Sequence, residues 1–130
     1  MTADALRSVM ARNAGIQAVM LKYVQAFLIQ VSHTAICNAH SHIDERLARW
    51  ILMAHDRVSG ATVLLTHEFL ALMLAVRRAG VTEALQALVA QGLIKAARGS
   101  VTVLDRKGLE TSAGDSYGVP ESEYRRLLGK

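Results

Sequence analysis

A long stretch of apolar positions at helical spacing opens the chain. Residues 14–37 read "AGIQAVMLKYVQAFLIQVSHTAIC". Positions four and three residues apart alternate along it and form a coiled-coil-like seam: Met20, Val24, Phe27, Val31 and Thr34. A second apolar set on another face contains Leu21, Leu28 and Ala35. A helix that is apolar on nearly all sides must be covered on nearly all sides, so two neighbours are expected, a partner helix and another domain.

An ordinary buried helix of a single domain is the alternative interpretation of residues 14–37. It ranks second, because too few residues remain in the chain to wrap such a helix. After a break at "NAHSHID", Ser41 followed by Asp44 and Glu45 predicts an N-cap and an acidic first turn. The helix after it, at about 43–57, is expected to bury Ile43, Leu47, Trp50, Ile51 and Ala54.

Two shorter helices joined by a tight turn are predicted next. A strand at 63–65 precedes them, and Thr66, with Glu68 in the first turn, predicts the start of a helix across "HEFLALMLA". A turn at 75–77 leads to a second helix at about 78–91, which Gly92 ends. The apolar positions of both helices are expected to form a shared core: Leu70, Leu74, Val81, Leu85 and Leu88.

Alternating β-rich runs follow the helix pair. "LIKAA" and "VTVLD" are joined at residues 98–100, which predicts a hairpin. A short helix is expected across "DRKGLETSAG", and Pro120 suits the first position of a last helix through Leu128. The predicted fold class is mainly α with a small β wing. Two helices crossing steeply, followed by a wing, would leave the polar N-terminal face of the second helix free to enter a DNA major groove.

Composition narrows the classes of function. Of 130 residues, 52% are hydrophobic and 5% aromatic, which favours helices packed through aliphatic side chains. The net charge of +4 fits a nucleic-acid partner without requiring one. The lone Cys37 excludes an internal disulfide and fits a reducing cytoplasm. Cys37, His40 and His42 straddle a predicted break, so no metal site is expected there.

Membrane and enzyme functions are not expected. The N-terminus lacks the pattern of a signal peptide, and the longest apolar run, "FLALMLAV", is too short to span a bilayer. No P-loop, no pair of carboxylates and no nucleophile–base pair stands at a recognisable spacing. The chain is therefore expected to be a soluble cytoplasmic protein rather than an enzyme.

Four segments together resemble the C-terminal part of Crp/Fnr-family transcription regulators: "ERLARWILMAHDRV", "LTHEFLALMLAVRRAGVTEAL", "GLIKAARGSVTVLDRKGLE" and "YGVPESEYRRLLG". The helix at 14–37 resembles the family's dimerisation helix. The resemblance implies a dimerisation segment at 1–40 and a winged helix-turn-helix domain at 41–130. It also implies a homodimer that reads a roughly palindromic operator in double-stranded DNA, with RNA polymerase as a further partner.

The family's upstream sensor β-roll has no counterpart in this sequence, which is consistent with a fragment, a short open reading frame or a misplaced start. By resemblance, Ser32 falls near a position at which the family's long helix contacts a cyclic nucleotide. Val31 replaces a polar neighbour there, so no cyclic nucleotide, and no other cofactor, is expected.

By the same resemblance, Arg78 occupies the family's base-reading position and can pair with guanine N7 and O6. Arg77 beside it is expected on a phosphate, as are the Thr66 hydroxyl and the helix start behind it. Solvated charges and a simple cap are the alternatives. The remaining candidates lie on the recognition helix and at the wing tip: Gly80, Thr82, Glu83, Gln86, Arg98, Gly99 and Ser100.

The sequence departs from the family pattern at two turn positions. Ala75 stands where glycine is usual, and Arg77 stands where a capping serine is common. Two other functions remain open. One is a dimerisation module that modulates full-length partners without binding DNA, and the other is a metal or redox switch that uses Cys37 and the histidines. DNA binding by the purified chain separates the first from a regulator, and metal analysis tests the second.

Overall fold

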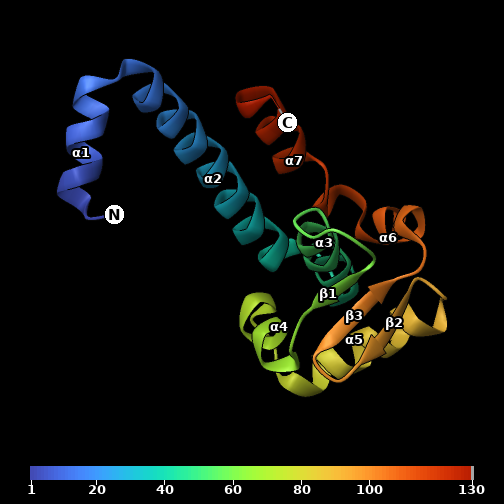
Figure 1. Ribbon diagram of the computed structural model, residues 1–130. Helices are drawn as coiled ribbons and strands as arrows, with labels where there is room; N and C mark the ends of the chain where they lie inside the picture. Colours follow the sequence, from blue (N-terminus) through green and yellow to red (C-terminus); the bar gives the residue numbers. More distant parts are fainter. Residues whose placement is uncertain (130) are drawn as a thin grey trace. The chain divides into compact units, whose positions relative to one another are not determined.

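The structure is a computed structural model that describes residues 1–129 (Figure 1). The chain forms two compact units. One contains residues 1–34 together with the C-terminal residues from 118, and the other contains residues 35–117. The functional division after residue 40 stays a prediction.

Helices make up the first unit. Helix α1 (Ala3–Arg12) starts at Thr2, whose hydroxyl accepts a hydrogen bond from the Ala5 amide. Sequence analysis did not predict α1, and none of its residues is buried. Helix α2 (Ala14–His40) begins in this unit and continues into the second unit, three residues beyond the predicted end. Helix α7 (Val119–Leu128) begins one residue earlier than predicted, so Pro120 is its second residue.

The second unit is a three-stranded antiparallel sheet packed with helices. Its helices are α3 (Ile43–His55), α4 (His67–Leu74), α5 (Arg78–Ala90) and α6 (Arg106–Ala113), followed by the 3₁₀ turn η1 (Gly114–Ser116). Strands β1 (Thr62–Leu64), β2 (Ile94–Ala97) and β3 (Ser100–Val103) pair in the order β1-β3-β2. This arrangement confirms the predicted fold of mainly α with a β wing, where the wing is the β2–β3 hairpin.

The predicted core of the helix pair is buried. Leu70 and Leu74 of α4 and Val81, Leu85 and Leu88 of α5 lie in one apolar cluster with the inward faces of α3 and the sheet. Each strand alternates between the two faces, so Val63 and Val101 enter this cluster. The shared core fixes α5 relative to α4 and leaves the opposite side of α5 exposed to solvent.

One predicted helix cap is confirmed and another is wrong. The Thr66 hydroxyl accepts from the Phe69 amide at 3.1 Å and caps α4 as expected. Ser41 does not cap α3, because His42 is the N-cap residue and makes no side-chain cap bond. The Ser41 hydroxyl instead lies 2.9 Å from that of Ser116, a contact across 75 residues that local spacing cannot indicate.

The turn between α4 and α5 is made without glycine. Ala75 has φ of 52°, and no other non-glycine residue among those described has a positive φ. A left-handed conformation costs an L-residue about 1–2 kcal/mol. Arg46 of α3 donates to the Leu74 carbonyl at 2.8 Å and so satisfies an acceptor that the end of α4 leaves open. The helix-turn-helix geometry is therefore kept despite the departure from the family pattern.

A polar cluster ties α3 to α6 and Tyr117. Arg106 donates to Asp56 at 2.7 Å, to the Tyr117 hydroxyl at 2.8 Å and to Glu110 at 3.0 Å, and its Nη1 lies 2.7 Å from His55 Nδ1. Tyr117 in turn donates to Asp56 at 2.8 Å. Burial opposes the charge on Arg106, but the hydrogen bond and charge of Asp56 raise the pKa of Arg106 above its ordinary value.

Candidate nucleic-acid interface

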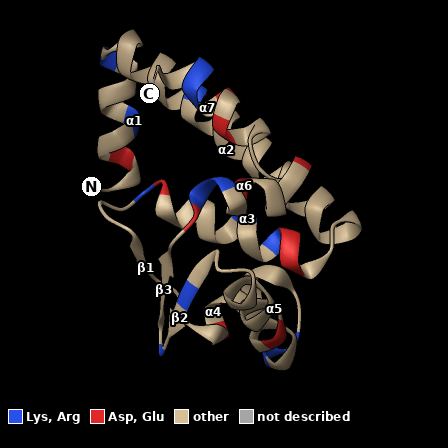
Figure 2. Ribbon diagram, turned by 90° about the vertical axis from the view of Figure 1, so that its right-hand side faces the viewer, with Lys and Arg blue, Asp and Glu red and all other residues tan. Residues whose placement is uncertain are grey.

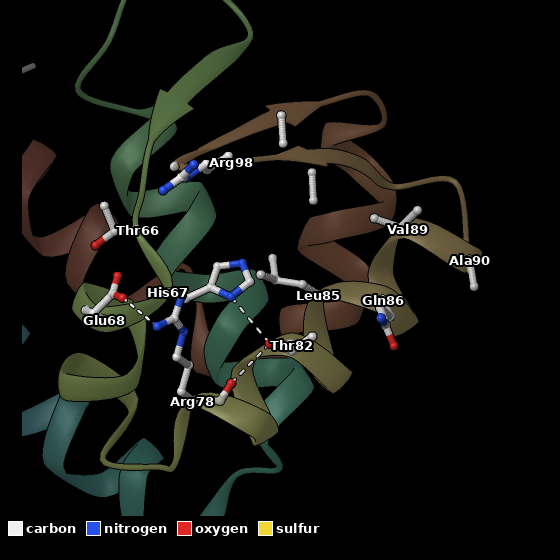
Figure 3. Close-up of a pocket in the computed structure, with 13 residues that line it drawn as sticks. Thr66, His67, Glu68, Arg78, Thr82, Leu85, Gln86, Val89, Ala90 and Arg98 are labelled. Atoms are coloured by element: carbon white, nitrogen blue, oxygen red, sulfur yellow. Dashed lines mark hydrogen bonds and ion pairs between the residues drawn. The ribbon is translucent and has the colours of Figure 1, made fainter.

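A groove lies between the start of α4, the outer side of α5 and the wing (Figure 3). Its volume is about 870 Å³. Polar side chains lie toward the start of α5 and the wing turn, and apolar ones lie along the rest of α5 and on β2. The lining residues that sequence analysis named are Thr66, Arg78, Thr82, Gln86, Arg98 and Gly99.

Four predicted residues lie outside this groove. Arg77 is the exposed N-cap residue of α5, and Glu83 is exposed on the same helix. Ser100 is the first residue of β3, where it pairs with Ala97 and with Leu64. Gly80 is half-buried, and a Cβ there would meet Ile43 Cδ1 of α3 at 3.3 Å. The glycine therefore has a packing role, because it lets α5 approach α3 closely.

Arg78 forms an ion pair at the opening of the groove. Its Nη1 lies 2.8 Å from Oε1 of Glu68 in the first turn of α4. The two side chains are 68% and 66% exposed, so the pair contributes little to folding. Its consequence is geometric, because it holds the guanidinium beside the N-terminus of α4.

His67 lines the groove and was missed by sequence analysis. Its Nδ1 lies 3.3 Å from the Thr82 hydroxyl, which also donates to the Arg78 carbonyl at 3.2 Å (Figure 3). The hydroxyl proton is therefore directed to that carbonyl, and the hydroxyl oxygen can accept from His67. One feature of the sequence could have indicated His67 as a site residue. It follows the N-cap Thr66 directly, beside the free backbone amides at the start of α4.

The wing tip supplies the positive charge on the far side of the groove. Arg98 and Gly99 form the two-residue turn between β2 and β3, and Gly99 has φ of 74°. In Figure 2 a blue segment marks this turn, and another lies on β2. Arg98 is exposed. The polar part of the groove therefore has two arginines, Arg78 at the start of α5 and Arg98 on the wing, and the apolar part extends toward Val89 and Ala90 (Figure 3).

The predicted dimer seam of α2 is exposed. Val24, Phe27 and Val31 are 47%, 52% and 48% exposed, and the seam also includes the half-buried Met20 and Thr34. The Tyr23 and Phe27 rings stack at 6.5 Å between centroids. By length and composition α2 is also, alone in the described part of the chain, able to cross a membrane. Such a helix is weak evidence for a membrane span, because dimerisation helices are equally apolar.

The residues considered for a metal do not form a site. Cys37 is buried, with its Sγ 3.9 Å from the Ser116 carbonyl oxygen, whereas His40 and His42 are exposed. Among residues 1–129, no group of three or more histidine, cysteine, aspartate or glutamate side chains is arranged to hold a metal.

Comparisons with known proteins agree on one family. The family model of the Crp-like helix-turn-helix domain matches residues 45–112. The search of curated protein sequences returned no match. Among solved structures, a CRP-family transcriptional regulator from Thermus thermophilus is similar with 29% identity and a TM-score of 0.63 over 88% of this chain and 56% of that one.

Two further regulators are also similar. A Crp/Fnr-family regulator from Eubacterium rectale is 25% identical, with a TM-score of 0.63 over 85% of this chain and 51% of that one. A second Thermus thermophilus regulator, of the CRP/FNR family, is 25% identical, with a TM-score of 0.60 over 66% of this chain and 47% of that one. The chain thus spans about half the length of these structures.

Proposed function

Because the chain belongs to the family of Crp-like helix-turn-helix domains, we propose that it is a sequence-specific DNA-binding transcription regulator. The groove carries this proposal, because it gathers Thr66, Arg78 and Arg98 from three separate elements onto one face. Basic groups on one face suit a polyanion, and a helix start on the same face suits a phosphate.

In this function α5 is the recognition helix and lies in the major groove of DNA. Arg78, at its first position, reaches a guanine with its planar donors, while the hydroxyl and first amides of α4 at Thr66 contact a phosphate. Arg98 contacts the backbone from the wing. Thr82 and Gln86 line the groove along α5, and the exposed Glu83 accepts from a cytosine amino group in this proposal.

Dimerisation is the second part of the proposal. Two copies of α2 pair through the seam, and each contributes one recognition helix, so the operator is roughly palindromic. The apolar faces of α2 are then covered by protein rather than by lipid. The proposed partners are double-stranded DNA, a second copy of the chain and RNA polymerase, in the cytoplasm.

The experiment compares two arginines of equal charge. An operator is selected from random duplexes with the purified chain, and Arg78→Ala and Arg98→Ala are titrated with salt against this operator and a scrambled duplex. Loss of a base contact at Arg78 is expected to cost about 1–3 kcal/mol on the operator alone. Loss of a phosphate contact at Arg98 should weaken binding to both duplexes. It should also make the slope of log affinity against log salt concentration shallower by about one. Equal weakening of both duplexes by Arg78→Ala contradicts base reading.

The exposed seam of α2 favours one alternative function. A chain that pairs through α2 but does not bind DNA would act as a dimerisation module that modulates longer partners. The same selection experiment separates the two functions, because the module dimerises without enriching any duplex sequence.

A further inference from the structure

The partner of Arg78 is an acid on the DNA-facing surface. Glu68 is the only acidic residue that lines the groove in the described part of the chain. A carboxylate beside a phosphate-binding surface repels DNA, so it weakens non-specific binding. Glu68 therefore reduces the attraction of this surface to DNA. Its 2.8 Å contact with Arg78 indicates a second effect, on the arginine itself.

The ion pair with Glu68 occupies only one nitrogen of the Arg78 guanidinium. Oε1 of Glu68 forms an ion pair with Nη1 of Arg78 at 2.8 Å, and within residues 1–129 neither side chain has another ion-pair or hydrogen-bond partner. Nε and Nη2 therefore remain as an adjacent pair of donors. A guanine presents two acceptors, O6 and N7, that an arginine engages through two donors. Figure 3 shows Glu68 and Arg78 meeting at the groove opening, below Thr66.

We propose that Glu68 is a positioning residue that orients Arg78 for base recognition and so raises the specificity of DNA binding. This proposal rests on the proposed function of Arg78. An exposed arginine has many rotamers, and ordering one on binding costs affinity. Glu68 restricts those rotamers before DNA arrives, and the pair becomes stronger when DNA excludes water from it. The acid thus lowers affinity for random DNA while it increases affinity for the operator.

The test measures binding of five proteins to the selected operator and to a scrambled duplex. These are the unmodified chain, Glu68→Ala, Glu68→Gln, Arg78→Ala and the double variant Glu68→Ala/Arg78→Ala. Glu68→Ala is expected to lower operator affinity about 3- to 10-fold and to leave scrambled binding equal or tighter. Glu68→Gln should fall between, because its amide oxygen can still accept from Nη1 without a charge. In the Arg78→Ala background, loss of Glu68 should no longer lower operator affinity.

Asp115→Ala is the charge control, because it removes an equal charge from an exposed residue outside the groove and without contact to Arg78. Its effect should add to that of Arg78→Ala. Replacing the contacted guanine by 7-deazaguanine removes the N7 acceptor. This replacement should weaken operator binding by the unmodified chain more than operator binding by Glu68→Ala. The proposal is overturned if Glu68→Ala tightens both duplexes equally, or if its operator defect persists without Arg78. If the unmodified chain selects no operator, the proposed function itself fails first.

Discussion

Helix α2 and the helix-turn-helix unit are both rich in apolar residues but use them differently. In the unit of residues 35–117, the leucines of α4 and α5 that face the core are fully buried in one cluster. In the first 21 residues of α2, from Ala14 to Thr34, only Ala26 is buried. The unit therefore completes its core within one chain, whereas α2 presents an apolar surface that a monomer leaves in water. Hydrophobic periodicity predicts that a residue is covered, but it does not say whether the cover comes from the same molecule.

The largest effect expected from this comparison is on stability. Leu74→Ala removes a fully buried side chain from the shared core and should cost about 2–5 kcal/mol of unfolding free energy. Leu28→Ala, at 58% exposure on α2, makes the same chemical change. It should cost under about 0.5 kcal/mol in the monomer. Urea denaturation at low protein concentration measures both, and equal losses would show that α2 is buried in the monomer.

A second prediction tests whether another copy of the chain covers the exposed seam of α2. Phe27→Asp places a charge in the seam and should weaken the dimer about 10- to 100-fold, because the carboxylate must be desolvated at the interface. Gln25→Asp, outside the predicted seam, is the matched control and should leave the association constant nearly unchanged. Sedimentation over a concentration series gives both constants. A wild-type chain that remains at 14.1 kDa at micromolar concentration rules out the dimer.

The polar cluster around Arg106 should contribute less than the apolar core. Arg106→Ala leaves Asp56 and Tyr117 without their shared donor, but the arginine side chain is 36% exposed, so water replaces part of the loss. Because of this exposure, Arg106→Ala should lower the free energy of unfolding by only about 1–2 kcal/mol. Thermal unfolding monitored by circular dichroism measures it. A cost as large as that of Leu74→Ala would show that Arg106 contributes as much stability as a fully buried core leucine, and would contradict this prediction.

The turn at Ala75 should allow a gain in stability. Ala75→Gly relieves the left-handed strain, while the greater freedom of glycine in the unfolded chain offsets part of the benefit. The net gain should be about 0.5–1 kcal/mol. Ala79→Gly on α5, where the backbone is helical, should instead lose a similar amount. A loss of stability from both changes would contradict the left-handed turn.

The sequence predicted most elements of the second unit, because each was indicated by local chemistry. Thr66 caps α4 through a bond three residues away, and the leucine spacing of α4 and α5 follows from helical periodicity. The groove is different. Arg78 and Arg98 lie 20 residues apart on separate elements, so their alignment depends on the packing of the wing against α5. The Glu68–Arg78 pair and the Ser41–Ser116 contact likewise join distant residues, which no local pattern indicates.

The smallest expected effect concerns an exposed ion pair in α7. Arg126 donates hydrogen bonds to Glu123, and these bonds lower the pKa of Glu123 below its ordinary value of 4.5. A carboxyl whose pKa is lower in the folded state stabilises the fold above its ordinary pKa, and this contribution is lost as the pH falls through the lowered value. Both side chains lie at the surface, where water screens the pair, so unfolding measurements should not detect the loss.

The titration of Glu123 itself is measurable. A carbon-detected NMR titration should give the Glu123 carboxyl a midpoint below its ordinary value of 4.5. Arg126→Gln should return that midpoint toward 4.5, because the substitution removes the positive donor. An unchanged midpoint in Arg126→Gln would mean that the pair is not populated in solution. In that case α7 would owe its order to its N-terminal cap, at which the Gly118 amide donates to Glu121 at 2.8 Å.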